Sequence, residues 1–220
     1  MKKVMIIGGH GKIALLLAPL LAEAGIEVSG VIRNSAQIDD VAAARATPVV
    51  HDVVSATAEE LATLFAGQDA IVWSAGAGGG SPERTYAVDR DAAIRTMDAA
   101  AAAGVSRYVM VSYLGAGPGH GVPSEDGFFA YAEAKAAADA HLRTTALAWT
   151  ILGPGALTSE EPTGTITTAP DMAHRNTSRA NVALVAAAVL DHAATIGHTI
   201  EFTDGDVPIG QALDQTLAKG

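Results

Sequence analysis

Short apolar runs alternate with longer stretches rich in alanine and leucine along most of the chain. The apolar runs are rich in β-branched residues and predict strands at 3–7, 27–32, 48–51, 70–74, 107–112, 148–152 and 199–203. The longer stretches predict helices at 12–24, 58–65, 84–103, 129–145, 179–192 and 210–219. Several strands are apolar at nearly every position, as expected when helices cover both faces of a sheet. The pattern predicts an α/β fold, a doubly wound Rossmann-type and mostly parallel sheet of about seven strands with helices on both faces.

One segment departs from this alternation. Residues 153–178 carry Gly, Pro, Ser and Thr with little periodicity, and the stretch is longer than a usual connection in a compact domain. It follows a predicted strand, so we expect a substrate flap at the carboxyl edge of the sheet. Nothing else resembles a linker or a repeat, and we expect residues 1–220 to form a single domain of this fold.

Composition narrows the function classes. The chain has no cysteine, which excludes a disulfide framework and a thiolate nucleophile and fits a cytoplasmic protein. Its 14 basic and 24 acidic residues give a net charge of −10, which argues against nucleic acid and against an anionic membrane surface as partners. The first apolar run is broken by glycines and no apolar run reaches ~18 residues, so we expect neither a secretory signal nor a membrane span.

The seven histidines lack the spacing of a zinc site, and we expect no metal. The expected partner is a small-molecule substrate. A homo-oligomer stays open, because the alanine-rich helix faces can pack either on the sheet or on another subunit.

A glycine-rich turn links the first predicted strand to the first predicted helix. Its pattern is G-x-x-G-x-x-A, in which the first glycine allows the tight turn, the second lets the backbone approach a pyrophosphate, and the alanine lets helix and strand pack closely. The helix N-terminus adds amide donors for phosphates. We therefore predict dinucleotide binding by Gly8, Gly9, His10, Gly11, Lys12 and Ile13. The alternative is a glycine-rich turn of some other α/β fold.

The residues at the end of the second predicted strand indicate whether NAD or NADP is preferred. An NAD site usually has an acidic residue there, whereas this chain has Arg33 and Asn34. A cation suits a 2′-phosphate, and Lys12 offers a second charge, so NADP(H) is the preferred cofactor and NAD(H) stays possible. The alternative is that both cations are solvated surface residues.

Two further strand ends supply candidate cofactor contacts. Asp52 and Val53 follow the third strand, where a carboxylate can accept a hydrogen bond from the adenine amino group and a valine can pack on the ring. Asp52 is nearly as well explained as a turn residue. After the fourth strand, backbone with small side chains would admit the ribose and phosphates at Ser74, Ala75 and Gly76. The alternative there is a mobile linker.

These motifs together resemble a known family. The glycine turn, the 74–77 and 109–112 segments, the Tyr-x-x-x-Lys of Tyr131 and Lys135, and the 204–206 ending are similar to the atypical short-chain dehydrogenase/reductases, specifically the small NAD(P)H-binding, NmrA-like and flavin-reductase-like group. The resemblance covers nearly the whole chain. It implies that Tyr131 exchanges a proton with the substrate oxygen, and that Lys135 lowers the pKa of Tyr131 and holds the nicotinamide ribose.

The residue pair itself supports part of this role. Tyr131 and Lys135 are one helical turn apart, and an ammonium near a phenol favours the phenolate. The alternative is ordinary packing with the lysine amine reaching solvent.

The chain also departs from the family pattern at two places. The family often has two hydroxyl residues at the end of the fifth strand, of which the second is commonly functional, whereas this chain has Ser112 followed by Tyr113. Either residue is therefore a candidate for the serine role. Relatives commonly have an arginine before Pro-Gly, where this chain has Gly153, which puts an anion or substrate contact in doubt.

The leading hypothesis is an NADP(H)-dependent oxidoreductase that transfers hydride to a small carbonyl, quinone or flavin acceptor. A non-catalytic NADP(H)-binding redox sensor is the alternative, favoured by the two departures. A sugar-nucleotide epimerase or dehydratase fits a larger branch of the fold, but the chain has few residues for a separate substrate domain.

Overall fold

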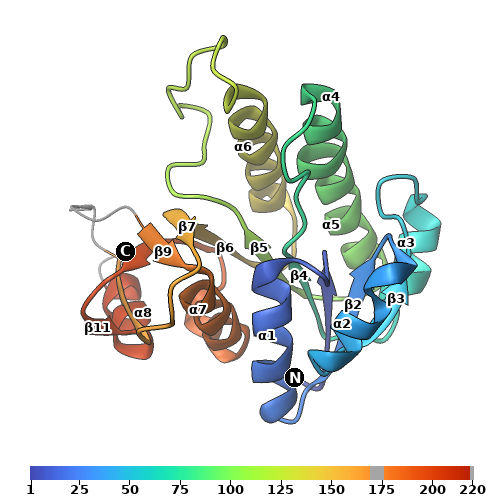
Figure 1. The fold of residues 1–220 in the computed structure, drawn as a ribbon, viewed down its shortest axis with the longest axis horizontal. Coiled ribbons are helices and arrows are strands. Elements are labelled where there is room, and N and C mark those ends of the chain that lie inside the picture. The colour runs from blue at the N-terminus through green and yellow to red at the C-terminus, as the bar shows by residue number, and fades with distance from the viewer. Residues whose placement is uncertain (169–175, 219–220) are drawn as a thin grey trace.

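The computed structural model describes residues 1–168 and 176–218, and its architecture is the predicted doubly wound α/β fold (Figure 1). The sheet has nine strands in the order β11-β8-β10-β6-β5-β4-β1-β2-β3, two more than the predicted seven. The two additions, β8 and β11, pair antiparallel at one edge. They were missed because strands of two or three residues are too short to show a period.

The seven parallel strands lie close to the predicted positions. They are β1 (Lys3–Ile7), β2 (Glu27–Ile32), β3 (Thr47–Val50), β4 (Ala70–Trp73), β5 (Arg107–Val111), β6 (Ala148–Pro154) and β10 (His198–Asp204). The short strands are β8 (Thr165–Thr167) and β11 (Val207–Pro208) in the main sheet, and β7 (Ala156–Thr158) with β9 (Asn176–Ser178) in a separate parallel pair.

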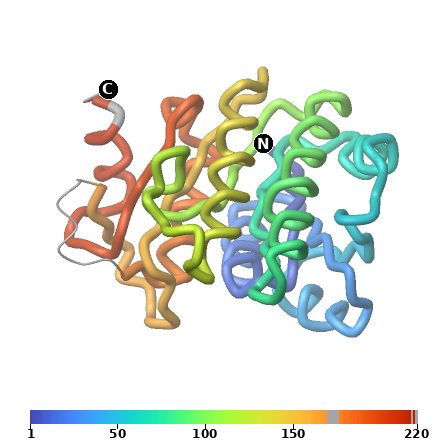
Figure 2. Tube along the Cα trace, turned by 90° about the horizontal axis from the view of Figure 1, so that it is seen from above, coloured from blue at the N-terminus to red at the C-terminus, as the bar shows by residue number. Residues whose placement is uncertain are grey.

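Helices cover both faces of the sheet. One face carries α1 (Lys12–Glu23), α7 (Arg179–Asp191) and α8 (Ile209–Leu217), and the other carries α3 (Ala58–Phe65), α5 (Ala93–Ala102) and α6 (Phe129–Thr144). Figures 1 and 2 show α1 beside α7, and α5 beside α6. The strands are buried on both sides, because each face has its own apolar core.

The predicted helix at 84–103 is divided into three parts. A short α4 (Pro82–Thr85) leads into η2 (Tyr86–Ala92), a π-helical segment, and α5 continues from it. Widened turns of this kind often occur at functional sites. The short 3₁₀ turn η1 (Ser35–Gln37) and α2 (Ile38–Ala43) were not predicted, because neither is long enough to show helical periodicity.

The strand order explains where a site can form. The chain passes β1, β2 and β3 in one direction and then returns to place β4 on the other side of β1. At such a reversal the loops after the neighbouring strands separate and leave a crevice at their carboxyl ends. The glycine-rich turn follows β1 directly, so it lies at this point.

The segment expected to be a flap has more regular structure than predicted. Its described part contains the end of β6 and the strands β7, β8 and β9. The rest of the expected flap, residues 169–175, lies outside the described residues.

Candidate functional site

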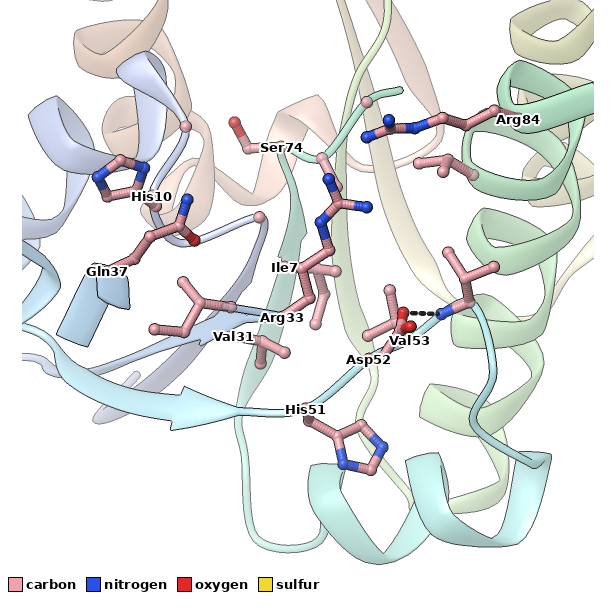
Figure 3. A pocket seen from close by; sticks show the side chains of 17 residues that line it. Ile7, His10, Val31, Arg33, Gln37, His51, Asp52, Val53, Ser74 and Arg84 are labelled. Carbon is pink, nitrogen blue, oxygen red and sulfur yellow. Dashed lines mark hydrogen bonds between the residues drawn. The ribbon is translucent and has the colours of Figure 1, made fainter. Parts of the chain in front are cut away.

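A first cavity of about 250 Å³ opens at the carboxyl ends of β1, β2, β3 and β4 (Figure 3). Its lining includes nine of the predicted cofactor residues, namely Gly8, His10, Gly11, Arg33, Asp52, Val53, Ser74, Ala75 and Gly76. Five of the predicted cofactor residues are absent from the lining, namely Gly9, Lys12, Ile13, Asn34 and Lys135. The cavity is therefore built from the loops after four different strands.

The glycine turn is shaped by backbone contacts. Gly8 has a φ of +85°, and a Cβ there would lie 2.7 Å from the Cα of Ala75. A Cβ at Gly9 would lie 2.7 Å from the Cα of Gly30, so Gly9 serves the close approach of the turn to β2. The Gly9 amide also donates to the Val31 carbonyl at 2.8 Å. Ile13 is buried in the core beneath the turn.

Two arginines line the first cavity. Figure 3 shows the Arg33 side chain extending into the cavity from the end of β2, and Arg84 reaching toward it from α4. Lys12, the second cation expected here, is exposed on α1 and does not line the cavity. The sequence did not point to Arg84, because it lies far along the chain in a short helix.

The remaining polar lining is partly committed to local bonds. Asp52 accepts a hydrogen bond from the Val54 amide at 3.0 Å, as an ordinary turn residue does, while still lining the cavity. Asn34, which lies outside the lining, caps η1 by accepting from the Ala36 amide. His10 bonds to Asp40 at 2.8 Å.

The cavity fits a nucleotide on structural grounds. Gly8 and Gly11 line it with backbone that has no Cβ, which leaves room for a phosphate close to the amides at the start of α1. Arg33 and Arg84 add positive charge to the same cavity. This combination matches an adenosine ribose and its phosphates.

A second cavity of about 590 Å³ lies at the ends of β5 and β6. Its lining comprises Ser112, Tyr113, Leu114, Phe128, Tyr131, Pro154, Gly155, Ala156, Leu157 and Arg179. Because β4 and β5 pair directly, the Ser74 loop of the first cavity and the Ser112 loop of the second follow adjacent strands. The two cavities therefore stand side by side at one edge of the sheet.

An aromatic cluster of Tyr113, Phe128 and Tyr131 forms one side of the second cavity. Their ring centroids are 5.1 to 5.6 Å apart. The Tyr113 hydroxyl is buried and has no hydrogen-bond partner among the described residues. The cluster thus offers flat apolar faces and one unused hydroxyl.

The Ser112 hydroxyl is bonded to a buried carboxylate. Its Oγ donates to Oδ2 of Asp139 at 2.6 Å, and Asp139 is 0% exposed. Burial raises the pKa of Asp139, while Lys135 and the bond from Ser112 partly oppose that shift. Sequence analysis missed Asp139, although it lies one helical turn after Lys135 and therefore on the same face of α6.

Lys135 is fully enclosed. Its Nζ donates to the Val111 carbonyl at 2.8 Å and lies 3.2 Å from the Met110 sulfur. Burial lowers the pKa of Lys135, and the nearby carboxylates of Asp139 and Asp89 oppose this. Asp89, from η2, accepts from the Ala77 amide at 3.0 Å and has its own pKa raised by burial. Lys135 therefore lies between two buried acidic groups.

Tyr131 faces the second cavity with a perturbed phenol. Burial raises the pKa of Tyr131, and the Asp89 and Asp139 carboxylates raise it further. The resemblance implied the opposite shift through Lys135, but the lysine ammonium is bonded to the Val111 carbonyl and not to the phenol. In this arrangement the phenol stays protonated near neutral pH.

Within residues 1–168 and 176–218, no helix is both long enough and apolar enough to span a bilayer. No group of three or more metal-ligating side chains occurs there. His174 lies outside the described residues.

Known proteins with similar sequences and structures cover almost the whole chain. Residues 8–193 match the model of the NAD(P)H-binding family. The chain is 35% identical over 214 residues to the uncharacterized sugar epimerase YhfK of Bacillus subtilis, spanning 96% of this chain and 98% of that protein.

Solved structures agree with these sequence matches. A candidate NAD-dependent epimerase/dehydratase from Bacillus halodurans superposes with a TM-score of 0.88 at 32% identity, covering 98% of this chain and 100% of that one. The oxidoreductase ylbE from Lactococcus lactis gives a TM-score of 0.85 at 29% identity, with 98% and 97% covered. This chain belongs to the NAD(P)H-binding family and, within it, to a group like the atypical short-chain dehydrogenase/reductases.

Proposed function

We propose that the protein is an NADP(H)-dependent oxidoreductase that transfers hydride to a small carbonyl, quinone or flavin acceptor. The observation that carries this proposal is the placement of the two cavities at adjacent strand ends, one suited to a nucleotide and the other lined by Tyr131. A dinucleotide held in the first cavity would extend its nicotinamide toward the second.

The preference for NADP(H) rests on the charges of the first cavity. Arg33 and Arg84 both line it, Arg33 from the end of β2 and Arg84 from α4. A 2′-phosphate accepts charge-assisted hydrogen bonds from guanidinium groups, which are stronger than bonds between neutral partners. An acidic side chain that would hold a free 2′-hydroxyl is absent from the end of β2, where Arg33 stands.

The chain's own residues have distinct parts in the reaction. The reduced nicotinamide supplies hydride when bound. As a hydride reaches the acceptor carbon, the C=O electron pair moves to oxygen, and Tyr131 donates its phenolic proton to that oxygen. The raised pKa of Tyr131 keeps the proton on the phenol at neutral pH, so the form that can donate is the one present. Water can return a proton to Tyr131, which is only partly buried.

Lys135 and Asp139 act as positioning residues in this proposal. Lys135 anchors α6 to the end of β5 through the Val111 carbonyl, which fixes where Tyr131 stands. Asp139 does the same through Ser112. The Tyr113 hydroxyl, which has no hydrogen-bond partner among the described residues, can donate to the acceptor. Pro154 and Leu157, from the described part of the segment 153–178, also line the second cavity, which supports the proposal of a substrate flap.

A redox sensor is the second candidate. It is favoured by the Ser112 hydroxyl, which is committed to Asp139, and by the lysine, which is bonded to a backbone carbonyl. In a sensor, the cofactor would bias a conformational state without turnover. A sugar epimerase is less well supported, because the second cavity presents mainly aromatic and aliphatic side chains.

The test is a titration with NADPH and NADH, followed by acceptor-dependent NADPH oxidation in the same sample. We expect NADPH to bind more tightly than NADH. Arg33→Gln and Arg84→Gln should each lower the affinity for NADPH by ~10-fold or more and leave the affinity for NADH unchanged. Arg45→Gln is the matched control, because Arg45 is exposed and paired with Glu23 away from both cavities. Equal affinity for the two nucleotides would refute the preference, and NADPH binding without oxidation by any acceptor would favour the sensor.

A further inference from the structure

We propose that the second cavity selects acceptors that carry an anionic substituent on a flat ring, and that Arg179 holds the anion. The inference rests on the proposed function, in that the occupant is the hydride acceptor. It assigns a charge preference that neither the fold nor the family match supplies.

Arg179 is the cationic residue in the lining of the second cavity. It begins α7 and is half-buried beside Leu157. Its Nη1 donates to the Thr158 carbonyl at 2.7 Å and to the Leu157 carbonyl at 3.2 Å. These bonds occupy one end of the guanidinium group.

The other edge of the guanidinium group is available to a ligand. Within residues 1–168 and 176–218, no hydrogen bond from Arg179 Nε or Nη2 occurs, and no carboxylate lies within 4.0 Å of the group. The Nε and Nη2 donors point in parallel, which matches two oxygens of a phosphate, sulfonate or carboxylate. Because this half-buried arginine has no acidic partner among the described residues, it favours an anion in the cavity.

The position of Arg179 is fixed by its neighbours. Ser178 caps α7 by accepting from the Asn181 amide, and Asp204 at the end of β10 accepts from both the Ser178 amide and the Asn181 side chain, at 2.8 and 2.6 Å. The start of α7 is thus tied to the sheet. A preorganised cation loses less entropy on binding than a mobile surface arginine.

The same cavity supplies a surface for a flat ring. Tyr113, Phe128 and Tyr131 present aromatic faces, and offset or edge contacts between rings add to the apolar burial. The volume of about 590 Å³ is in the range of small-molecule sites.

The experiment compares pairs of probes that differ only in the anionic group. Riboflavin and flavin mononucleotide form one pair, and 1,4-naphthoquinone and its 2-sulfonate form the other. Affinities are measured by quenching of flavin emission or of protein emission, with saturating NADP⁺ so that the first cavity is filled and no turnover occurs. The proteins are wild type, Arg179→Gln, Arg179→Lys and the control Arg45→Gln.

We expect wild type to bind the anionic member at least ~10-fold more tightly in at least one pair. Arg179→Gln should reduce this ratio to about one while leaving the affinity for the neutral member unchanged, which also verifies folding. Arg179→Lys should recover part of the ratio, because it keeps the charge and loses the two parallel donors. Arg45→Gln should keep the wild-type ratio.

Three results would overturn the inference. They are equal affinity within both pairs, a ratio that survives Arg179→Gln, and no detectable binding of any probe. Because these are binding measurements, tight and charge-selective binding without NADPH oxidation would instead contradict only the proposed hydride transfer.

Discussion

Replacing Gly9 by alanine tests whether the glycine turn depends on contact with β2. A Cβ at Gly9 would lie 2.7 Å from the Cα and carbonyl carbon of Gly30 and 3.1 Å from the Val31 amide nitrogen. Gly9 is not among the residues with positive φ, so its backbone conformation is one that alanine can adopt. The cost of Gly9→Ala would therefore come from steric overlap of the new Cβ. The atoms in conflict belong to backbone, which cannot move aside as the end of a side chain can.

The cost follows from the displacement required. Ordinary contact begins at 3.4 Å, so the turn and β2 must separate by about 0.7 Å. That movement would weaken the bonds that Gly8 and Gly9 donate to the Val31 carbonyl, now 3.2 and 2.8 Å long. Overpacking typically costs about 1–3 kcal/mol and each weakened bond adds up to about 1 kcal/mol. We therefore expect Gly9→Ala to lose about 2–4 kcal/mol of unfolding free energy.

The assays are denaturant unfolding and NADPH titration. Gly25→Ala is the control, because Gly25 has a φ of +80° with nothing within 4 Å of its would-be Cβ. Its cost should be about 1–2 kcal/mol from backbone strain alone, with NADPH affinity unchanged. Gly9→Ala should also weaken NADPH binding, because the turn that approaches the phosphates is moved. A Gly9→Ala protein as stable as wild type, with the same NADPH affinity, would refute this account of the turn.

Two other residues give sharp predictions. Tyr131→Phe should lower kcat for a carbonyl acceptor by ~100-fold or more and leave NADPH affinity unchanged. Because the pKa of Tyr131 is raised, the rate of carbonyl reduction by the wild type should not decline as the pH rises through neutrality. A rate that falls with rising pH near neutrality would contradict this. Asp139 has a raised pKa, so the folded state holds its proton more tightly than the unfolded state, and its contribution to stability is lost as pH rises above the ordinary value of 3.8 through the folded value. The free energy of unfolding of Asp139→Asn, measured relative to wild type by denaturant unfolding, should therefore be higher at pH 8 than at pH 4. The same difference between the two proteins at both pH values would contradict the raised pKa.

Strands and long helices were predictable because their burial leaves a period in the sequence. The strand β1 and the helix α3 have the predicted bounds, since each is a continuous apolar or amphipathic run with a clear stop. The edge strands β8 and β11 were not predictable, because their pairing is set by partners distant in sequence. The interruption at η2 was not predictable either, since its residues fit a helical pattern on both sides.

The candidate sites divide in a similar way. Residues that directly follow a strand, such as Arg33 and Ser74, could be placed from sequence because parallel strands end at one edge. Arg84 and Arg179 reach their cavities from helices whose packing brings them there, and no local pattern distinguishes them from surface arginines. Asp139 is an intermediate case, because its spacing from Lys135 was visible but its bond to Ser112 depends on how α6 meets β5.

The wide turn at η2 changes the direction in which side chains before it point relative to side chains after it. An α-helix advances about 100° per residue, and a π turn accommodates one residue more than an α turn. Arg84 precedes this turn and lines the first cavity, whereas Met97 and Ala100 follow it and pack in the core together with Val88 and Ala92 of η2. Deleting one residue at the exposed Asp91 would rotate the site-facing part by about 100° and leave the core-facing part in place. The deletion would therefore move Arg84 away from the first cavity and also displace the buried side chain of Val88. The length of this segment, and not only the identity of its residues, thus determines which cation faces the cofactor cavity.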